Sequence, residues 1–118
     1  MSDADTTVET LREAMRAFVA ERAWEKYHTP KNLVMSLAIE AAELMEHFQW
    51  LDSDESHEIA GSPQALAEVG DELADVLCYA LSLANVLHVD VSDAVLEKLR
   101  KNALKYPADR YRGRYRAD

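Results

Sequence analysis

The segment from Pro63 to about His88 constrains the fold most, because it is expected to form one long helix. Its apolar residues recur at helical spacing, and Ser62 before Pro63 supplies an N-cap with proline at the first helical position. Between Val76 and Leu87 almost every face is apolar, which is typical of a helix buried in a bundle or at a subunit interface. Gly and Pro number only three each and no convincing strand pattern appears, so an all-α fold is expected.

Three further helices are expected from the same periodicity. The first runs from about Thr7 to Lys26, and the second, which Thr29 caps, runs from about Pro30 to Trp50. The polar segment from Asp52 to Ser62 has no periodicity and is expected to be a loop. A fourth helix follows from Asp90, its cap, to about Lys105. Short connections between long helices predict antiparallel packing in a four-helix bundle.

Composition narrows the classes of partner and compartment. The 118 residues are enough for one domain, which is expected to span residues 1–118 with a basic tail from about residue 108. The formal charge of −9 makes nucleic-acid polymers unlikely partners. The single cysteine, Cys78, leaves no disulfide framework and fits a reducing cytoplasm. The run from Val76 to Leu87 is too short to span a bilayer, so no membrane partner is expected.

Two acidic pairs stand against the apolar stripes of neighbouring helices. Glu40 and Glu43 lie three residues apart on the second helix, and Glu72 and Asp75 lie three apart on the third, so each pair shares a helix face. If the two helices pack as a hairpin, the four carboxylates can face one another at the margin of the core. Four such groups repel one another and resist desolvation, and Mg²⁺, which takes oxygen ligands, is the natural ion to neutralise them. The alternative is an ordinary solvated acidic face.

The fourth helix carries a cationic and polar stripe. Lys98, Asn102 and Lys105 are spaced four and three apart and so share one face. Such a stripe opposite a metal-loaded acidic site suits a polyphosphate. Ordinary lysines near a helix C-terminus are the alternative interpretation.

Aromatic residues end the first two helices and follow the acidic pair of the third. Trp24, Trp50 and Tyr79 could hold a nucleobase between their rings, and His28 could contact the same ligand. Core packing of the two tryptophans and a backbone-bonded loop role for His28 are the alternatives.

Taken in order, these motifs resemble the MazG-like, all-alpha nucleoside triphosphate pyrophosphohydrolases, and within them the dCTP pyrophosphatase branch. The pattern Glu-x-x-Glu, twenty-eight residues, then Glu-x-x-Asp is similar to that family's signature. The resemblance runs from Phe18 to Pro107, through the segments WEKYHTPKNL, EAAELMEHFQW, DELADVLCY and the ending K-x-x-x-N-x-x-K-Y-P.

The resemblance implies roles for the residues at matching positions. The metal ligands, and the catalytic set, would be Glu40, Glu43, Glu72 and Asp75. The nucleotide would be surrounded by Trp24, His28, Trp50 and Tyr79, with Lys98, Asn102 and Lys105 on the phosphate side. Met15 stands where deoxycytidine-specific relatives carry a histidine, which leaves the base preference open. The family also forms dimers, or tetramers of dimers, with the site at a subunit interface.

The expected protein is therefore a cytoplasmic, homo-oligomeric helical hydrolase. It would cut (deoxy)nucleoside triphosphates, dCTP or modified dNTPs, to the monophosphate and pyrophosphate with Mg²⁺, or Mn²⁺ as the alternative ion, and so clean the nucleotide pool. A di-metal carboxylate oxidoreductase is a rival, but His47 follows Glu43 by four residues rather than three and no second such motif exists. A non-catalytic helical interaction module is the other rival.

Overall fold

The structure, a computed structural model, describes residues 1–116 and is all-helical over that part. The last two residues of the expected basic tail lie outside the described residues. The chain divides into two compact units, Met1–His88 and Val89–Asp118. The first unit contains α1 (Val8–Glu21), η1 (Glu25–Tyr27), α2 (Pro30–Glu46), α3 (Ser53–His57), η2 (Glu58–Gly61) and α4 (Pro63–Leu87). The second contains α5 (Val91–Lys105) and α6 (Ala108–Tyr111).

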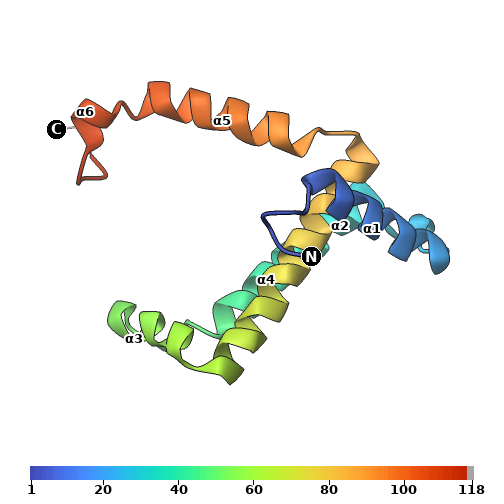
Figure 1. Cartoon of the computed structure of the whole chain (residues 1–118), viewed down its shortest axis with the longest axis horizontal. Coiled ribbons are helices and arrows are strands. Elements are labelled where there is room, and N and C mark those ends of the chain that lie inside the picture. Colours follow the sequence, from blue (N-terminus) through green and yellow to red (C-terminus); the bar gives the residue numbers. More distant parts are fainter. Residues whose placement is uncertain (117–118) are drawn as a thin grey trace. The chain divides into compact units, whose positions relative to one another are not determined.

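In the first unit, α1 and α2 both pack against the long helix α4 (Figure 1). Three helices begin where their caps predicted, because the side-chain oxygens of Thr29, Ser62 and Asp90 each accept a backbone N–H three residues on. The first helix begins near Thr7 as expected, and the structure shows that Thr7 caps it in the same way. The four long predicted helices are thus all present.

The ends of the first two helices were predicted too late. Helix α1 ends at Glu21 rather than near Lys26, because Ala23 adopts a left-handed conformation with φ 51°. The Trp24 N–H then donates to the Val19 carbonyl (3.1 Å) and the Ala23 N–H to the Ala20 carbonyl (3.0 Å), which is a Schellman motif.

Aromatic packing accompanies this chain reversal. The rings of Phe18 and Trp24 meet edge to face at 6.0 Å, and the Arg22 guanidinium lies 3.7 Å from the centre of the Phe18 ring. The turn therefore delivers Trp24 and the residues after it to the N-terminal end of α2.

The segment after α2 was also predicted incorrectly. Helix α2 ends at Glu46 rather than Trp50, and the expected loop from Asp52 to Ser62 contains α3 and η2. A capping box begins α3: the Asp52 carboxylate accepts the Glu55 N–H (2.8 Å), and the Glu55 carboxylate accepts the Asp52 N–H (3.2 Å). This local signal, Asp-x-x-Glu, is readable in the sequence and starts a helix without any apolar periodicity.

Little apolar surface is fully buried within one chain. Among the described residues, only Leu33 and Ala84 are buried apolar side chains. The apolar second half of α4 remains partly exposed, with Leu77 54% accessible. The expectation that this helix is buried on all sides is therefore not met by the single chain.

A buried polar contact joins α1 to the C-terminal end of α4. The Arg12 Nε donates to the Asn85 side-chain oxygen (2.8 Å), and the Asn85 amide donates back to the Arg12 carbonyl (3.1 Å). A guanidinium nitrogen of Arg12 also reaches the Ala84 carbonyl at 3.3 Å. Because these groups satisfy one another away from water, they fix the position of α1 along α4.

No single helix in the described part is long and apolar enough to cross a membrane; only α4 and α5, taken together as a bent pair, reach the required length and composition.

Candidate functional site

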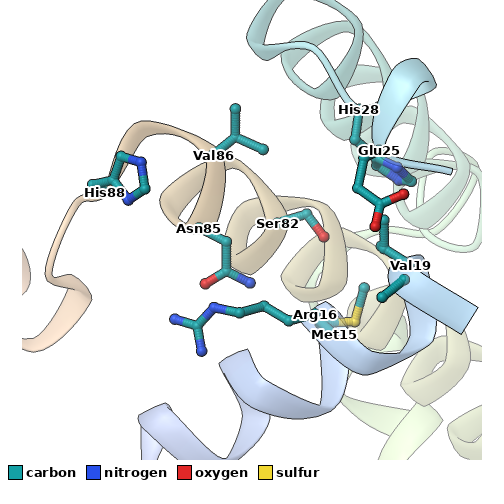
Figure 2. A pocket seen from close by; sticks show the side chains of 10 residues that line it. Met15, Arg16, Val19, Glu25, His28, Ser82, Asn85, Val86 and His88 are labelled. Carbon is teal, nitrogen blue, oxygen red and sulfur yellow. The ribbon is translucent and has the colours of Figure 1, made fainter. Parts of the chain in front are cut away.

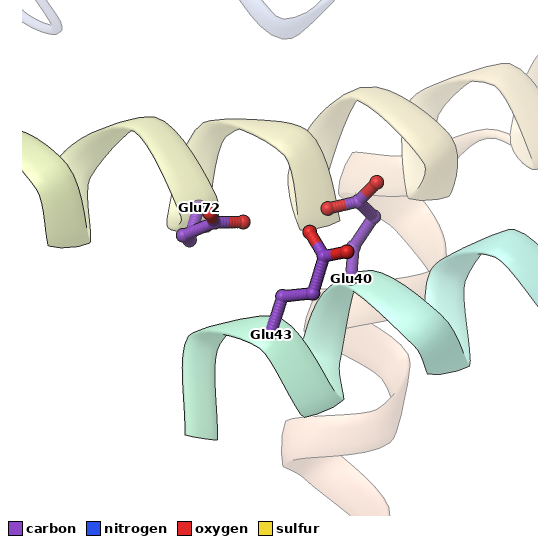
Figure 3. Close-up of side chains that lie close together, drawn as sticks. All are labelled: Glu40, Glu43 and Glu72. Atoms are coloured by element: carbon purple, nitrogen blue, oxygen red, sulfur yellow. The ribbon is translucent and has the colours of Figure 1, made fainter. Parts of the chain in front are cut away.

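Three of the four predicted carboxylates meet between α2 and α4. Glu40 and Glu43 project from α2 toward Glu72 on α4 (Figure 3). One carboxylate oxygen from each of the three lies within 4.8 Å of the others, which is the spacing of a shared cation site. The spacing of three residues on each helix brings this about, because it turns both members of a pair toward the facing helix.

The fourth carboxylate, Asp75, lies outside this close group but acts on it. Its side chain is exposed, one turn after Glu72 on α4. Its negative charge contributes to raising the pKa of both Glu40 and Glu72. The structure thus places Asp75 within electrostatic reach of the cluster without bringing its oxygens as close.

Within the described part of the chain, few groups neutralise the negative charge of the cluster or form hydrogen bonds to its oxygens. The Oε2 atoms of Glu40 and Glu72 are both buried and have no hydrogen-bond partner there. The pKa of Glu40 is raised to about 7, chiefly by loss of hydration, and also by hydrogen bonding to Glu43 and by the charges of its acidic neighbours. Loss of water also raises the pKa of Glu72, and nearby His47 opposes this only in part. A carboxylate set with buried, unpaired oxygens fits a hard divalent cation.

The raised pKa of Glu40 makes the metal-free protein sensitive to pH. A carboxyl with a higher pKa in the folded than in the unfolded state stabilises the fold fully below the unfolded value and loses that contribution as pH rises through the folded one. We therefore expect the free energy of unfolding to fall between about pH 4.5 and about pH 7 in EDTA.

Thermal unfolding of the wild type and of Glu40→Gln across this range measures the effect. The amide keeps the side chain's shape without its charge, so the variant should lose stability less steeply as pH rises. Parallel curves for the two proteins would contradict the assignment of the slope to Glu40.

Two cavities are lined by residues of η1 and of the C-terminal half of α4. The smaller, of about 220 Å³, is lined by Trp24, His28 and Tyr79, together with Tyr27, Asn32, Leu33 and Ser36. The larger, of about 390 Å³, lies between α1, η1 and α4 and shares His28 with the smaller one (Figure 2). Tyr79 is four residues after Asp75 on α4, so the smaller cavity lies one turn from the acidic pair.

Of the four residues predicted to surround the nucleotide, Trp24, His28 and Tyr79 line the same cavity, and the fourth does not. The alternative of core packing is wrong for both tryptophans, because Trp24 is 42% and Trp50 86% exposed. Trp50 lines neither cavity. The His28 Nδ1 lies 3.0 Å from the Trp24 carbonyl, so the backbone contact expected of a loop histidine exists alongside its place in both cavities.

The cationic stripe lies in the second unit. Lys98, Asn102 and Lys105 are all on α5, where Asn102 is half-buried and the two lysines are exposed. The Lys105 ammonium lies 5.3 Å from the centre of the Tyr106 ring. Their role toward phosphates stays a prediction.

Sequence reasoning missed several polar residues of the larger cavity. Ser82 and Asn85 stand in the apolar half of α4, and Glu25 lies on η1. A polar residue inside an otherwise apolar helical run was the available signal for Ser82 and Asn85.

Comparison with known proteins identifies the family of this chain. The model of the MazG-like family matches residues 35–115. Proteins named dCTP pyrophosphatase 1 are similar: the mouse protein is 40% identical over 109 residues, covering 92% of this chain and 64% of its own, and the human protein is 41% identical over 104 residues, covering 88% and 61%. The chain thus spans somewhat less than two thirds of these curated relatives.

A solved structure supports the fold as well. The crystal structure of a pyrophosphatase from Archaeoglobus fulgidus is 44% identical, with a TM-score of 0.79, and the match covers 91% of this chain and 98% of that one. The family model covers more than half of the chain, including the three carboxylates of the acidic cluster. The chain is a member of the MazG-like family.

Proposed function

We propose that this protein is a nucleoside triphosphate pyrophosphohydrolase that depends on a divalent cation, Mg²⁺ by preference. The observation that carries the proposal is the acidic cluster between α2 and α4 with an aromatic cavity one turn further along α4. The names of the relatives, dCTP pyrophosphatase and pyrophosphatase, support the same reaction. The preferred substrates would be dCTP or modified dNTPs, and the role would be cleaning the cytoplasmic nucleotide pool.

The metal ligands would be Glu40, Glu43, Glu72 and Asp75. When bound, the cation supplies positive charge that neutralises the phosphates and favours attack by water. One of the four carboxylates would accept a proton from that water as its oxygen attacks the α-phosphorus. The bond from the α-phosphorus to the bridging oxygen then breaks, and pyrophosphate leaves while the nucleoside monophosphate remains.

The residues around the cluster would hold the rest of the substrate. The rings of Trp24 and Tyr79 flank the smaller cavity and would contact the nucleoside, with His28 between the two cavities. Lys98, Asn102 and Lys105 would face the phosphates. Trp50 is exposed and lines neither cavity of its own chain, and in a homo-oligomer with the site at a subunit interface it would serve a neighbouring copy.

Product analysis tests the proposal. The purified protein is incubated with each canonical dNTP and several 5-modified dNTPs, with Mg²⁺, with Mn²⁺ and with EDTA, and the products are separated by chromatography. We expect pyrophosphate and the monophosphate, with no turnover in EDTA. Stepwise release of orthophosphate would indicate a phosphatase instead, and no release from any nucleotide would favour a non-catalytic interaction module.

A further inference from the structure

The Ser82 side chain is an unexplained polar group on α4. It is only 4% exposed, and its hydroxyl has no hydrogen-bond partner among the described residues. A buried hydroxyl without a partner costs free energy, so such a group in a folded protein calls for a ligand or a water molecule.

This hydroxyl faces the larger cavity. In Figure 2 it points from α4 into the space between Val19 and Glu25, and the walls there are otherwise largely apolar, including Met15 and Val86. A cavity of about 390 Å³ with apolar walls and a few polar groups is of the size and character of a small-molecule site.

The cavity is aligned with the acidic cluster. Ser82 follows Asp75 by seven residues, so both lie on nearly the same face of α4, about 10 Å apart along the helix axis. Tyr79 lies between them on the same face. A nucleotide with its phosphates at the cluster and its sugar near Tyr79 would therefore place its base in the larger cavity.

The Ser82 hydroxyl and the Glu25 carboxylate offer oxygen acceptors to the cavity, whose wall also includes the donors of Arg16 and His88. Asn85 is bonded on both sides to Arg12, and Arg16 is paired with Glu9 and Glu13. The Glu25 carboxylate forms no ion pair within the described part of the chain and extends toward Ser82 (Figure 2).

His28 adds a further acceptor. Because the Trp24 carbonyl can only accept, the His28 Nδ1 must donate to it, which leaves Nε2 of the neutral ring without a hydrogen. Ser82, Glu25 and the Nε2 atom of His28 thus offer acceptors to a ligand edge that donates hydrogen bonds.

We propose that Ser82 and Glu25 bind an exocyclic amino group of the base, and that the Glu25 carboxylate, which can only accept hydrogen bonds, determines base specificity. The proposal rests on the function proposed above and names residues that select its substrate. dCTP and dUTP differ at this edge by an amino group against a carbonyl oxygen, so they form the matched pair of substrates.

The experiment measures kcat/KM for dCTP and dUTP, together with melting temperature, in the wild type, Ser82→Ala, Glu25→Gln and the control Ser92→Ala. Ser92 is exposed on α5, so the control makes the same chemical change away from the cavity. Ser82→Ala should lower kcat/KM for both nucleotides about three- to tenfold, as expected for one lost hydrogen bond, because the hydroxyl can also donate to the carbonyl oxygen of dUTP. Its melting temperature should not fall, because an unpartnered hydroxyl is removed.

Glu25→Gln should reduce the preference for dCTP over dUTP, because the amide can also donate to a carbonyl oxygen. A wild type that prefers dUTP, or a Glu25→Gln variant with an unchanged ratio between the two substrates, would overturn the specificity role while leaving the proposed function intact. A wild type that releases no pyrophosphate from either nucleotide would overturn both. A lower melting temperature of Ser82→Ala with unchanged kcat/KM for both nucleotides would overturn the role of Ser82 in binding.

Discussion

Glu43→Ala should abolish pyrophosphate release, with a loss of about a thousandfold or more in kcat/KM. A cation at such a site contributes several kcal/mol of charge stabilisation in the transition state, and each 1.36 kcal/mol is a factor of ten in rate. Glu43 belongs to the three carboxylates whose oxygens converge within 4.8 Å, and its own side chain is exposed, so its loss leaves no cavity in the core. Asp75→Ala should give the same loss if Asp75 is also a ligand.

The stability of the same variants separates loss of metal from loss of fold. Removing one charge from a repulsive cluster should keep or raise the melting temperature of the metal-free protein, and should remove the increase that Mg²⁺ gives the wild type. Glu46→Ala is the matched control, because Glu46 is exposed at the end of the same helix and outside the cluster. Full activity of Glu43→Ala would refute the metal assignment.

The acidic cluster was predictable because its cause is local. Spacing of three residues on a helix determines which side chains share a face, and the apolar stripes determine which helices meet. The helix starts were predictable for the same reason, since Thr29, Ser62 and Asp90 bond to their own helices. That α2 packs on α4 is the one tertiary step this inference required, and the structure confirms it.

Other features depended on contacts that periodicity does not reveal. The left-handed Ala23 ends α1 without the glycine that usually marks such a cap, and so the first helix was predicted too long. The larger cavity forms only when α1, η1 and α4 pack together, so the sequence pattern does not reveal it. Ser82 becomes a candidate binding residue only because it lines that cavity. The exposed Trp50 and the lysines of α5 would contact substrate or a second copy of the chain. The periodicity of one chain does not predict such contacts.

Exposed apolar side chains lead to the second large expected effect, which concerns assembly. On α4, Leu66, Leu73 and Leu77 lie at intervals of seven and four residues, on one stripe, and each is about half exposed. Helix α2 exposes a second set to a similar extent, consisting of Val34, Met35, Ile39 and Met45. Contiguous apolar surface of this kind marks an interface in soluble proteins. We therefore expect light scattering to give at least twice the chain mass of 13.3 kDa at micromolar concentration.

Leu77→Lys should break that assembly. Full burial of a leucine contributes about 1.5–3 kcal/mol, about half of the Leu77 side chain remains to be buried, and a two-fold interface contains the residue twice, so the dissociation constant should rise by roughly ten- to a hundredfold. Because Leu77 is already 54% exposed within one chain, the variant should keep its helix content by circular dichroism. Gln64→Lys is the control, since it adds the same charge at an exposed polar position of α4. If Trp50 acts on a neighbouring copy, dissociation should also raise the Michaelis constant, whereas a wild type of monomer mass would show that the apolar stripe is not an interface between copies.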